Sequence, residues 1–247
     1  MFNFFSKKSK TPAELCFGTD IHCHIVPGVD DGAPDPETAA DIIEGMQSFG
    51  IRRIIASPHV TQVTFENDES TIEPALALLH AELDRRGNDI GVSHSAEYRI
   101  DELFHNRLEN NELMLLPNNH ILIENSFIQE PWNLDNLIFD LQVKGLVPVL
   151  AHPERYAYYY TQKNRYRTLH DAGLNLQINL LSLAGAYGPA ERSIAEYLIK
   201  QGLVDFIGTD IHRRSHVEKI KQYLLTKDAR NDMEALSKLV KNDSAFN

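Results

Sequence analysis

Histidine and carboxylate side chains gather near the start of the sequence, in the stretch DIHCHIVPGVDDG at residues 20–32. His22 and His24 are two positions apart, so on a strand both imidazoles leave on the same side. Asp31 follows seven residues after His24, inside a turn rich in proline and glycine. Two imidazoles and one nearby carboxylate form part of a shell for a divalent metal ion. A His-x-His pair alone is weak evidence, so the interpretation depends on further ligands downstream.

Further candidate ligands follow the apolar segments farther along the chain. At or just past the ends of these segments lie His59, Glu97, Glu124, His152, Asp210 and His212. In a β/α barrel the carboxyl ends of the strands converge at one rim, where active sites are built. A random scatter of His, Asp and Glu would not keep this register six times, so we predict a metal centre at that rim.

The elements that must position these residues alternate between apolar strands and amphipathic helices. Seven strands are expected, the first ending with His22 and His24 and the others at 52–57, 89–97, 120–124, 146–152, 174–179 and 204–208. Helices are expected from Asp35 to Gly50, around 72–87, and at 101–109, 132–144, 157–171, 190–201 and about 215–240. This alternation favours an α/β fold with a parallel sheet, because the crossover connections place helices on its faces.

The composition excludes several classes of protein. The 247 residues carry a formal net charge of −11, which argues against nucleic acid as a partner because phosphate backbones need a basic surface. No apolar run approaches the roughly 18 residues of a membrane span, so no stable membrane insertion is expected. Cys16 and Cys23 cannot form a disulfide scaffold, which favours a cytoplasmic protein. Neither cysteine begins the Cys-x5-Arg loop of a cysteine-dependent phosphatase.

The first ten residues, MFNFFSKKSK, place an apolar patch before the lysines. A secretory signal has the opposite order and a longer apolar core. We expect a flexible tail at residues 1–15 and a single domain at 16–247. A homo-oligomer stays open, with the tail as an arm on a neighbouring subunit.

The order and spacing of these motifs resemble the PHP (polymerase and histidinol phosphatase) superfamily. The resemblance is carried by the HxH followed by DDG, SPH at 57–59, SAEYRID at 95–101, LIENSF at 122–127, AHPERY at 151–156 and the final DxH at 210–212. Within the superfamily the chain is most similar to the CpsB/CapC-type bacterial protein-tyrosine phosphatases, from about Thr19 to His216. The resemblance implies a distorted (β/α)7 TIM-like barrel, with two or three divalent metal ions that are most often manganese.

The resemblance also implies how the ligands are shared. His22, His24, Glu97 and Asp210 would hold one ion, Glu97, Glu124 and His152 a second, and Asp31, His59 and His212 a third. These oxygen and nitrogen donors suit Mn, Fe, Zn or Mg and do not choose among them. Asp30, beside Asp31, competes for the ligand role in its loop. Asp210 and His212 are assigned catalytic roles together with Arg155.

A phosphatase also needs cationic donors for the phosphate oxygens. Arg155, in AHPERY, is expected to act as a bidentate phosphate clamp. The alternative for this residue is a surface ion pair with Glu154. Arg213 or Arg214, just past the DxH motif, could be a second phosphate-binding residue.

The expected function is that of a metal-dependent phosphomonoester hydrolase that uses a metal-activated hydroxide. The resemblance implies a protein-tyrosine phosphatase acting on the phosphotyrosine tail of a bacterial tyrosine kinase linked to capsular or exopolysaccharide synthesis. A phenol, with a pKa near 10, leaves more readily than an alkyl alcohol, so the lack of an obvious general acid agrees with an aryl phosphate. The tyrosines at 156 and 158–160 could wall a pocket, but packing of an aromatic-rich helix start on the barrel is favoured.

Three alternatives stay open at this level. One is a histidinol-phosphate phosphatase or another PHP phosphoesterase. The second is an amidohydrolase-like or TatD-like hydrolase, which also begins with HxH but usually has eight strands. The third is a silent barrel that binds phosphorylated tails or stores metal.

Overall fold

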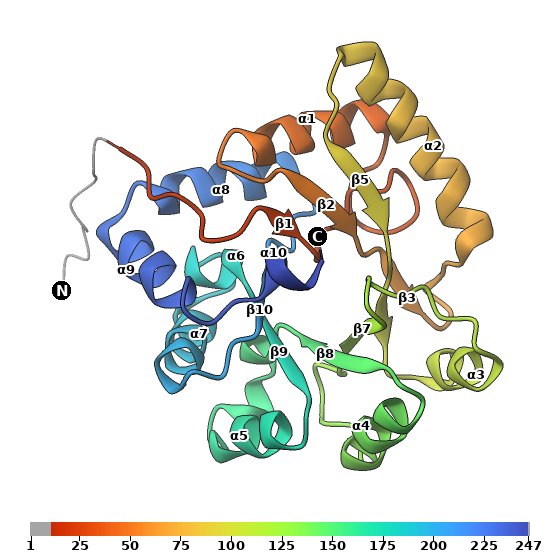
Figure 1. Cartoon of the computed structure of the whole chain (residues 1–247), viewed down its shortest axis with the longest axis vertical. Coiled ribbons are helices and arrows are strands. Elements are labelled where there is room, and N and C mark those ends of the chain that lie inside the picture. Colours follow the sequence, from red (N-terminus) through yellow and green to blue (C-terminus); the bar gives the residue numbers. More distant parts are fainter. Residues whose placement is uncertain (1–10, 247) are drawn as a thin grey trace.

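Strands lie at the centre of the molecule and helices surround them (Figure 1). The computed structural model describes residues 11–246. The strands are β1 (Thr19–Asp20), β2 (Arg53–Ala56), β3 (His59–Thr61), β4 (Phe65–Glu66), β5 (Gly91–His94), β6 (Glu97–Arg99), β7 (His120–Glu124), β8 (Val147–Ala151), β9 (Asn175–Asn179) and β10 (Phe206–Gly208). The helices are α1 (Pro36–Gln47), α2 (Glu69–Arg86), α3 (Glu102–Asn110), α4 (Leu134–Val143), α5 (Asn164–Asp171), α6 (Leu180–Leu183), α7 (Pro189–Gln201), α8 (Arg214–Leu224), α9 (Lys227–Leu236) and α10 (Asn242–Ala245).

The strand pairing runs round a ring and is almost wholly parallel. One sheet has the order β1-β2-β5 and the other the order β10-β9-β8-β7-β6-β3-β4, in which only β3 and β4 are antiparallel. A parallel bridge between Cys23 and Ile211 joins the segment after β1 to the segment after β10. The backbone bonds beside it run from His24 N to Ile211 O (2.9 Å) and from Asp210 N to His22 O (2.7 Å). The predicted α/β fold with parallel strands is confirmed.

Two of the predicted strands bend where the two sheets meet. The strand expected at 52–57 ends as β2 and resumes as β3 after Pro58, which has no N–H for the ladder. The strand expected at 89–97 is likewise divided into β5 and β6. Backbone bonds from Ser95 N to Ala56 O (2.8 Å) and from Glu97 N to Pro58 O (3.0 Å) keep the two bent strands together. The bend places His59 opposite Glu97 in the β3–β6 register.

Some of the helix boundaries follow local capping. Asp35 accepts a hydrogen bond from Thr38 N (2.7 Å) at the start of α1, as expected for an N-cap followed by proline. The helix expected at 157–171 is wrong in its first half, where the 3-10 turn η2 (Ala157–Tyr159) precedes α5. Another 3-10 turn, η1 (Pro153–Arg155), lies just before the expected range. The helix expected at 215–240 is interrupted because Thr226 caps a new helix, α9, by accepting from Ala229 N (3.1 Å).

A small apolar cluster fills the ring beneath the candidate ligands. Its members are Ile21, Ile55, Leu116, Leu122, Val149, Ala151, Phe206 and Phe246. Leu122 and Glu124 share one face of β7 because alternate residues of a strand point the same way. Phe246, which follows α10, packs against Phe206 with ring centroids 5.2 Å apart. These apolar side chains therefore fill the inside of the ring of strands, below the polar candidate ligands.

Most of the expected tail lies outside the described residues, which begin at 11. Within the rest of it, Ala13 is buried and its N–H donates to Leu224 O (2.7 Å). This part of residues 1–15 therefore packs against the end of α8. In the part of the chain that the structure describes, no helix has the length and apolar character needed to cross a membrane.

Candidate metal centre

The structure brings all nine predicted metal ligands close together, although His59 and Glu97 begin β3 and β6 rather than end a strand. Their donor atoms form four overlapping groups, each with its atoms within 4.8 Å of one another. The groups are His24, Asp31, His59 and His212; His22, Glu97 and His152; His22, His24 and Asp210; and His59, Glu97 and Glu124. Two residues depart from the expected sharing of ligands. His24 also lies with Asp31, His59 and His212, and His59 also lies beside Glu97 and Glu124.

Glu97 is the centre of this cluster. Its Oε1 lies 3.0 Å from His152 Nε2 and 3.3 Å from His22 Nε2. Its Oε2 lies 2.9 Å from His59 Nδ1 and 3.6 Å from His24 Nε2. Burial alone would raise the pKa of this carboxyl, but His22, His59 and the hydrogen bond with His152 together hold it well below its usual value. Glu97 is therefore an ionised carboxylate that touches four imidazoles.

Asp210 presents its two oxygens to different partners. Oδ1 faces three imidazoles at 3.5–3.6 Å, those of His22, His24 and His212. Oδ2 accepts from Arg155 Nη1 (3.0 Å), Asn179 Nδ2 (2.6 Å) and the Tyr187 hydroxyl (2.6 Å). Because three donors hold Oδ2, Oδ1 is left as the oxygen that can reach a metal ion.

Two of the candidate ligands have a left-handed backbone, which is uncommon outside glycine. The φ angle is 34° at His152 and 55° at Asp210, directly or two residues after the ends of β8 and β10. Such conformations cost about 1–3 kcal/mol and persist where the surroundings enforce them, often at functional sites. Here they turn the chain at the strand ends, where both side chains enter the cluster.

Each histidine of the HxH pair is anchored through one ring nitrogen. His22 Nδ1 lies 2.7 Å from Gln177 Oε1, and His24 Nδ1 lies 2.8 Å from Asp30 Oδ2. Within the described residues, Nε2 of both rings is buried without a hydrogen-bond partner. Metal-binding histidines characteristically use one nitrogen for an outer partner and the other for the ion. This pattern fits a divalent metal, and it separates the roles of Asp30, which orients His24, and Asp31.

The imidazoles differ in their affinity for protons. Burial opposes the charge on His22, but Glu97 and Asp210 outweigh it and raise the pKa of this ring to about 9. Burial lowers the pKa of both His152 and His212 to about 4. A metal ion can therefore meet neutral His152 and His212 directly, whereas its binding to His22 must release a proton.

Replacing Asp30 by asparagine should weaken the binding of Mn²⁺ by about 10–100-fold, the usual cost of losing an outer partner of a ligand histidine. The reason is the loss of the charge that holds His24 Nδ1, since His24 lowers the pKa of Asp30 to about 2 despite burial. Titration of the metal-free protein with Mn²⁺ by calorimetry measures the effect. Asp41→Asn, an aspartate of α1 paired with Arg86, is the control, and equal affinities in the two variants would contradict the role of Asp30.

Beside the cluster lies a cleft of about 270 Å³. Besides six of the ligands, its lining includes Arg99, Phe127, Arg155, Tyr187, Arg213 and His216. The Arg155 guanidinium lies 4.9 Å from the centre of the Phe127 ring and 4.2 Å from that of Tyr187. Among the described residues its one hydrogen bond uses Nη1, so its other N–H groups are free to meet a ligand. The cleft thus combines a candidate metal cluster with an available guanidinium.

The comparisons with known proteins agree with this geometry. The sequence model of the family described as "Capsular polysaccharide synthesis, CpsB/CapC" matches residues 18–244. The chain belongs to the CpsB/CapC family. It is 31% identical over 237 residues to the tyrosine-protein phosphatase YwqE of Bacillus subtilis (strain 168), covering 92% of this chain and 93% of that protein. The predicted resemblance is confirmed.

Two further relatives extend this result within the CpsB/CapC family. The tyrosine-protein phosphatase CpsB of Streptococcus pneumoniae is 28% identical over 201 residues, covering 78% of this chain and 82% of that protein. A chain from the crystal structures of Bacillus subtilis YwqE and Streptococcus pneumoniae CpsB, described as unique metal-dependent tyrosine phosphatases, superposes with a TM-score of 0.78. That match has 30% identity and covers 89% of this chain and 91% of the other.

The expected arginines of this CpsB/CapC chain take three different places. Arg155 lies in the cleft, and the alternative ion pair with Glu154 is wrong because Glu154 is buried and accepts from Asn179 N (2.8 Å). Arg213 lines the cleft and donates to His216 Nε2 (2.9 Å). Arg214 is not part of the lining and instead pairs with Asp41 of α1. The structure therefore does not bring Arg214 to the site.

Several residues of the site were missed by sequence reasoning. Gln177 and Asn179 alternate along the apolar strand β9, and this polar pair at spacing two was a usable signal. Tyr187 and Phe127 lie in connecting segments, where no periodicity marks them. The tyrosines expected to pack on the barrel do so at Tyr156 and Tyr159, which are both buried and do not line the cleft.

Proposed function

We propose that this protein is a metal-dependent tyrosine phosphatase of the CpsB/YwqE type, which hydrolyses the phosphate ester of phosphotyrosine. The observation that carries the proposal is that Arg155 lies in a small cleft lined by six of the nine convergent candidate metal ligands. The curated relatives that match most of the chain are tyrosine phosphatases.

Two or three divalent ions, with manganese as the leading candidate, fit the donor set. Glu97 would be shared between ions because its two oxygens face different groups of imidazoles. When bound, such ions lower the pKa of water and neutralise charge on the phosphoryl oxygens. Carboxylate and imidazole donors are compatible with Mn, Fe, Zn or Mg, so a metal comparison belongs in the test.

The protein's own side chains would bind and orient the phosphate ester. Arg155 donates N–H groups to the non-bridging oxygens, and its hydrogen bond to Asp210 keeps the guanidinium at the edge of the cluster. Phe127 stacks on His152 with ring centroids 5.7 Å apart and an interplanar angle of 18°, which leaves an aromatic wall beside the phosphate position. A phenolate with a pKa near 10 leaves without a strong proton donor.

The partner that fits this activity is the phosphotyrosine tail of a bacterial tyrosine kinase acting in capsular or exopolysaccharide synthesis. The family description links the chain to capsular polysaccharide synthesis. Such a tail would be met in the cytoplasm, and Cys16 and Cys23 as free thiols agree with a reducing compartment.

Removing the metal should lower the rate of phosphate release from a phosphotyrosine peptide by about 10³-fold, because the ions supply several kcal/mol of charge stabilisation. The measurement compares chelator-treated protein before and after addition of Mn²⁺, Fe²⁺, Zn²⁺ or Mg²⁺. Phosphoserine peptide and histidinol phosphate are the alternative substrates. Full activity in the metal-free protein, or faster turnover of histidinol phosphate, would contradict the proposal.

A further inference from the structure

The segment between β7 and α4 has apolar side chains on two sides. Phe127 faces the cleft, where it stacks on His152. The next residue, Ile128, is 87% exposed and, with Trp132 at 92%, lines a separate groove on the outer side. Residues 125–133 thus form a wall shared by the cleft and this groove.

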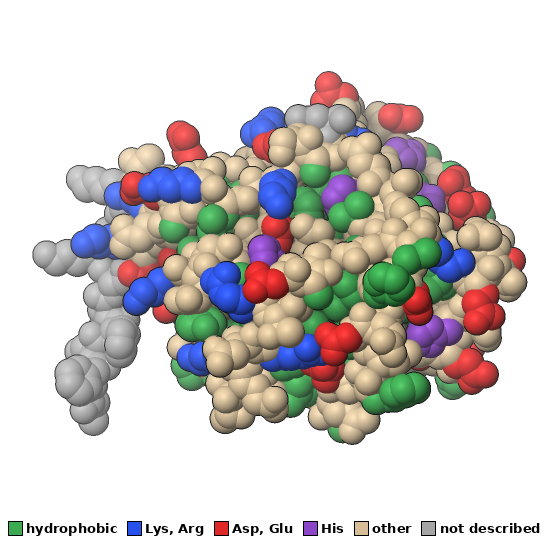
Figure 2. Space-filling model, turned by 60° about the horizontal axis from the view of Figure 1, so that its bottom comes forward, with side chains coloured by type: hydrophobic (Ala, Val, Ile, Leu, Met, Phe, Trp, Pro, Cys, Tyr) green, Lys and Arg blue, Asp and Glu red, His purple; other side chains and the backbone are tan. Residues whose placement is uncertain are grey.

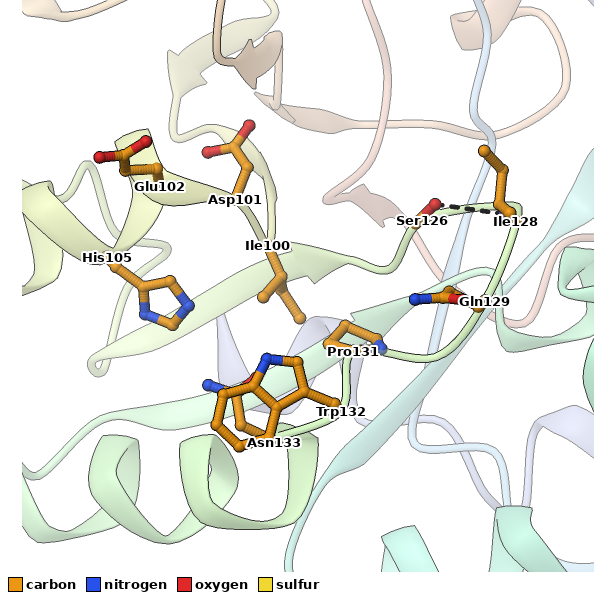
Figure 3. Close-up of a pocket in the computed structure, with 10 residues that line it drawn as sticks. All are labelled: Ile100, Asp101, Glu102, His105, Ser126, Ile128, Gln129, Pro131, Trp132 and Asn133. Atoms are coloured by element: carbon orange, nitrogen blue, oxygen red, sulfur yellow. Dashed lines mark hydrogen bonds between the residues drawn. The ribbon is translucent and has the colours of Figure 1, made fainter.

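The groove has a volume of about 800 Å³ and lies between the start of α3 and the 125–133 wall. Figure 3 shows Ile100 and Pro131 near its centre, with Trp132 and the acidic pair Asp101 and Glu102 on opposite sides. The floor is therefore apolar and one rim is acidic. A partner with acidic side chains at that rim would be repelled.

Exposed apolar side chains concentrate in this region. Seven large apolar residues are exposed among the described residues, and five of them lie between 127 and 143: Phe127, Ile128, Trp132, Phe139 and Val143. Figure 2 shows apolar side chains reaching the surface between charged ones on the face that includes the lower part of Figure 1. Exposed apolar surface of this kind, rimmed by polar groups, is typical of an interaction site.

The cleft is too small to hold more than the phosphotyrosine side chain of a polypeptide substrate. About 270 Å³ suits a phosphate and an aromatic ring, whereas a polypeptide substrate must continue outside it. The two linings alternate along this segment, since Phe127 belongs to the cleft and its neighbours Ser126 and Ile128 belong to the groove. The cleft and the groove therefore lie on the two sides of one segment, which an extended peptide advancing about 3.3–3.6 Å per residue would cross in about three residues.

We propose that the groove is a docking subsite for the substrate chain, which takes an apolar or aromatic side chain within about three residues of the phosphotyrosine. This inference rests on the proposed phosphatase function and adds a sequence preference to it. Trp132 and Ile128 contact the flanking side chain, while Asp101 and Glu102 disfavour acidic neighbours.

Trp132 is the single tryptophan of the chain, so its fluorescence reports on the groove directly. The test uses the Mn²⁺-loaded full chain and two peptides in which phosphonomethyl-phenylalanine replaces phosphotyrosine. One peptide has leucine at the second and third flanking positions and the other has serine there. The leucine peptide should shift the Trp132 emission to shorter wavelength and bind about tenfold more tightly. Equal affinities, or calorimetric binding of both peptides without a shift, would overturn the proposal.

Kinetics separate docking from chemistry. Trp132→Ala should lower kcat/KM for the leucine-flanked phosphotyrosine peptide by about tenfold, through KM, because the aromatic contact with the flanking leucine is lost. Turnover of p-nitrophenyl phosphate, which fills the cleft alone, should stay unchanged. Leu78→Ala, at an exposed leucine of α2 outside the groove, is the matched control. Equal peptide kinetics in the two variants would refute the subsite.

The outcomes distinguish this inference from the proposed function. Wild-type protein that hydrolyses no phosphotyrosine peptide with any metal would refute the function, whereas an active enzyme indifferent to Trp132→Ala refutes only the groove. A second copy of the chain is the competing occupant. Two measurements on the protein without peptide test for it: Trp132 emission at rising protein concentration and sedimentation. If the emission shifts with concentration, a dimer sediments and Trp132→Ala abolishes that dimer, the groove serves self-association and the proposal is overturned.

Discussion

Glu97→Gln should lower kcat for phosphotyrosine hydrolysis by about 10³-fold or more, because the charge of one ligand contributes several kcal/mol at such a cluster. Glutamine keeps the shape of the side chain but removes the negative charge that lies within 3.6 Å of four imidazoles. Glu97 lies opposite His59 in the strand register, so its carboxylate is held at the centre of the candidate ligands. Steady-state kinetics at saturating Mn²⁺, with metal content measured in parallel, provide the test.

The control for Glu97→Gln is Glu73→Gln, at an exposed α2 residue that lies 3.2 Å from His94 Nε2, outside the cluster. That substitution should leave kcat and metal content unchanged. Circular dichroism of each variant checks that the ring of strands is formed. A folded Glu97→Gln protein with wild-type turnover and full metal content would remove the basis of the proposed centre.

Arg155→Ala should lower kcat/KM for phosphotyrosine peptides by about 10²–10³-fold, the usual loss when one preorganised donor to a developing charge is removed. It should also weaken competitive inhibition by inorganic phosphate. Affinity for Mn²⁺ should change little, because Asn179 and Tyr187 still donate to Asp210 Oδ2 when the arginine is gone. Separate measurements of kinetics, phosphate inhibition and metal binding distinguish these effects.

Two further substitutions complete the test of Arg155. Arg155→Lys keeps the charge but not the planar fork, so it should recover only part of the lost activity. Arg214→Ala, which removes a neighbouring arginine that pairs with Asp41 outside the cleft, should act like wild type. If excess Mn²⁺ restored full activity to Arg155→Ala, the residue would support the metal cluster through Asp210 and the phosphate clamp would be wrong.

The alternation of strands and helices, and the place of most donors just past a strand, could be predicted from the sequence. The short elements β4, α6 and α10 could not, nor could the starts of β3 at His59 and of β6 at Glu97. The features that could be predicted depend on short-range patterns, since the period of two in strands and the capping residues of helices act within a few positions. Asp35 at the start of α1 and the HxH pair after β1 are examples. The helix expected at 157–171 is wrong in its first half, where buried Tyr156 and Tyr159 pack the chain into a short turn that local propensity does not predict, and right in its second half, α5.

The tertiary structure alone decided how the donors are used. Asp30 rather than Asp31 holds His24, and Arg155 rather than Arg214 enters the cleft. The grouping of the ligands depends on the paired bend of β2–β3 and β5–β6, and the groove beside Trp132 depends on how the 125–133 wall faces α3. The physical reason is that such contacts join segments distant in sequence. Their distances are set by the closure and packing of the whole ring, whereas local sequence determines only which groups each strand delivers to its rim.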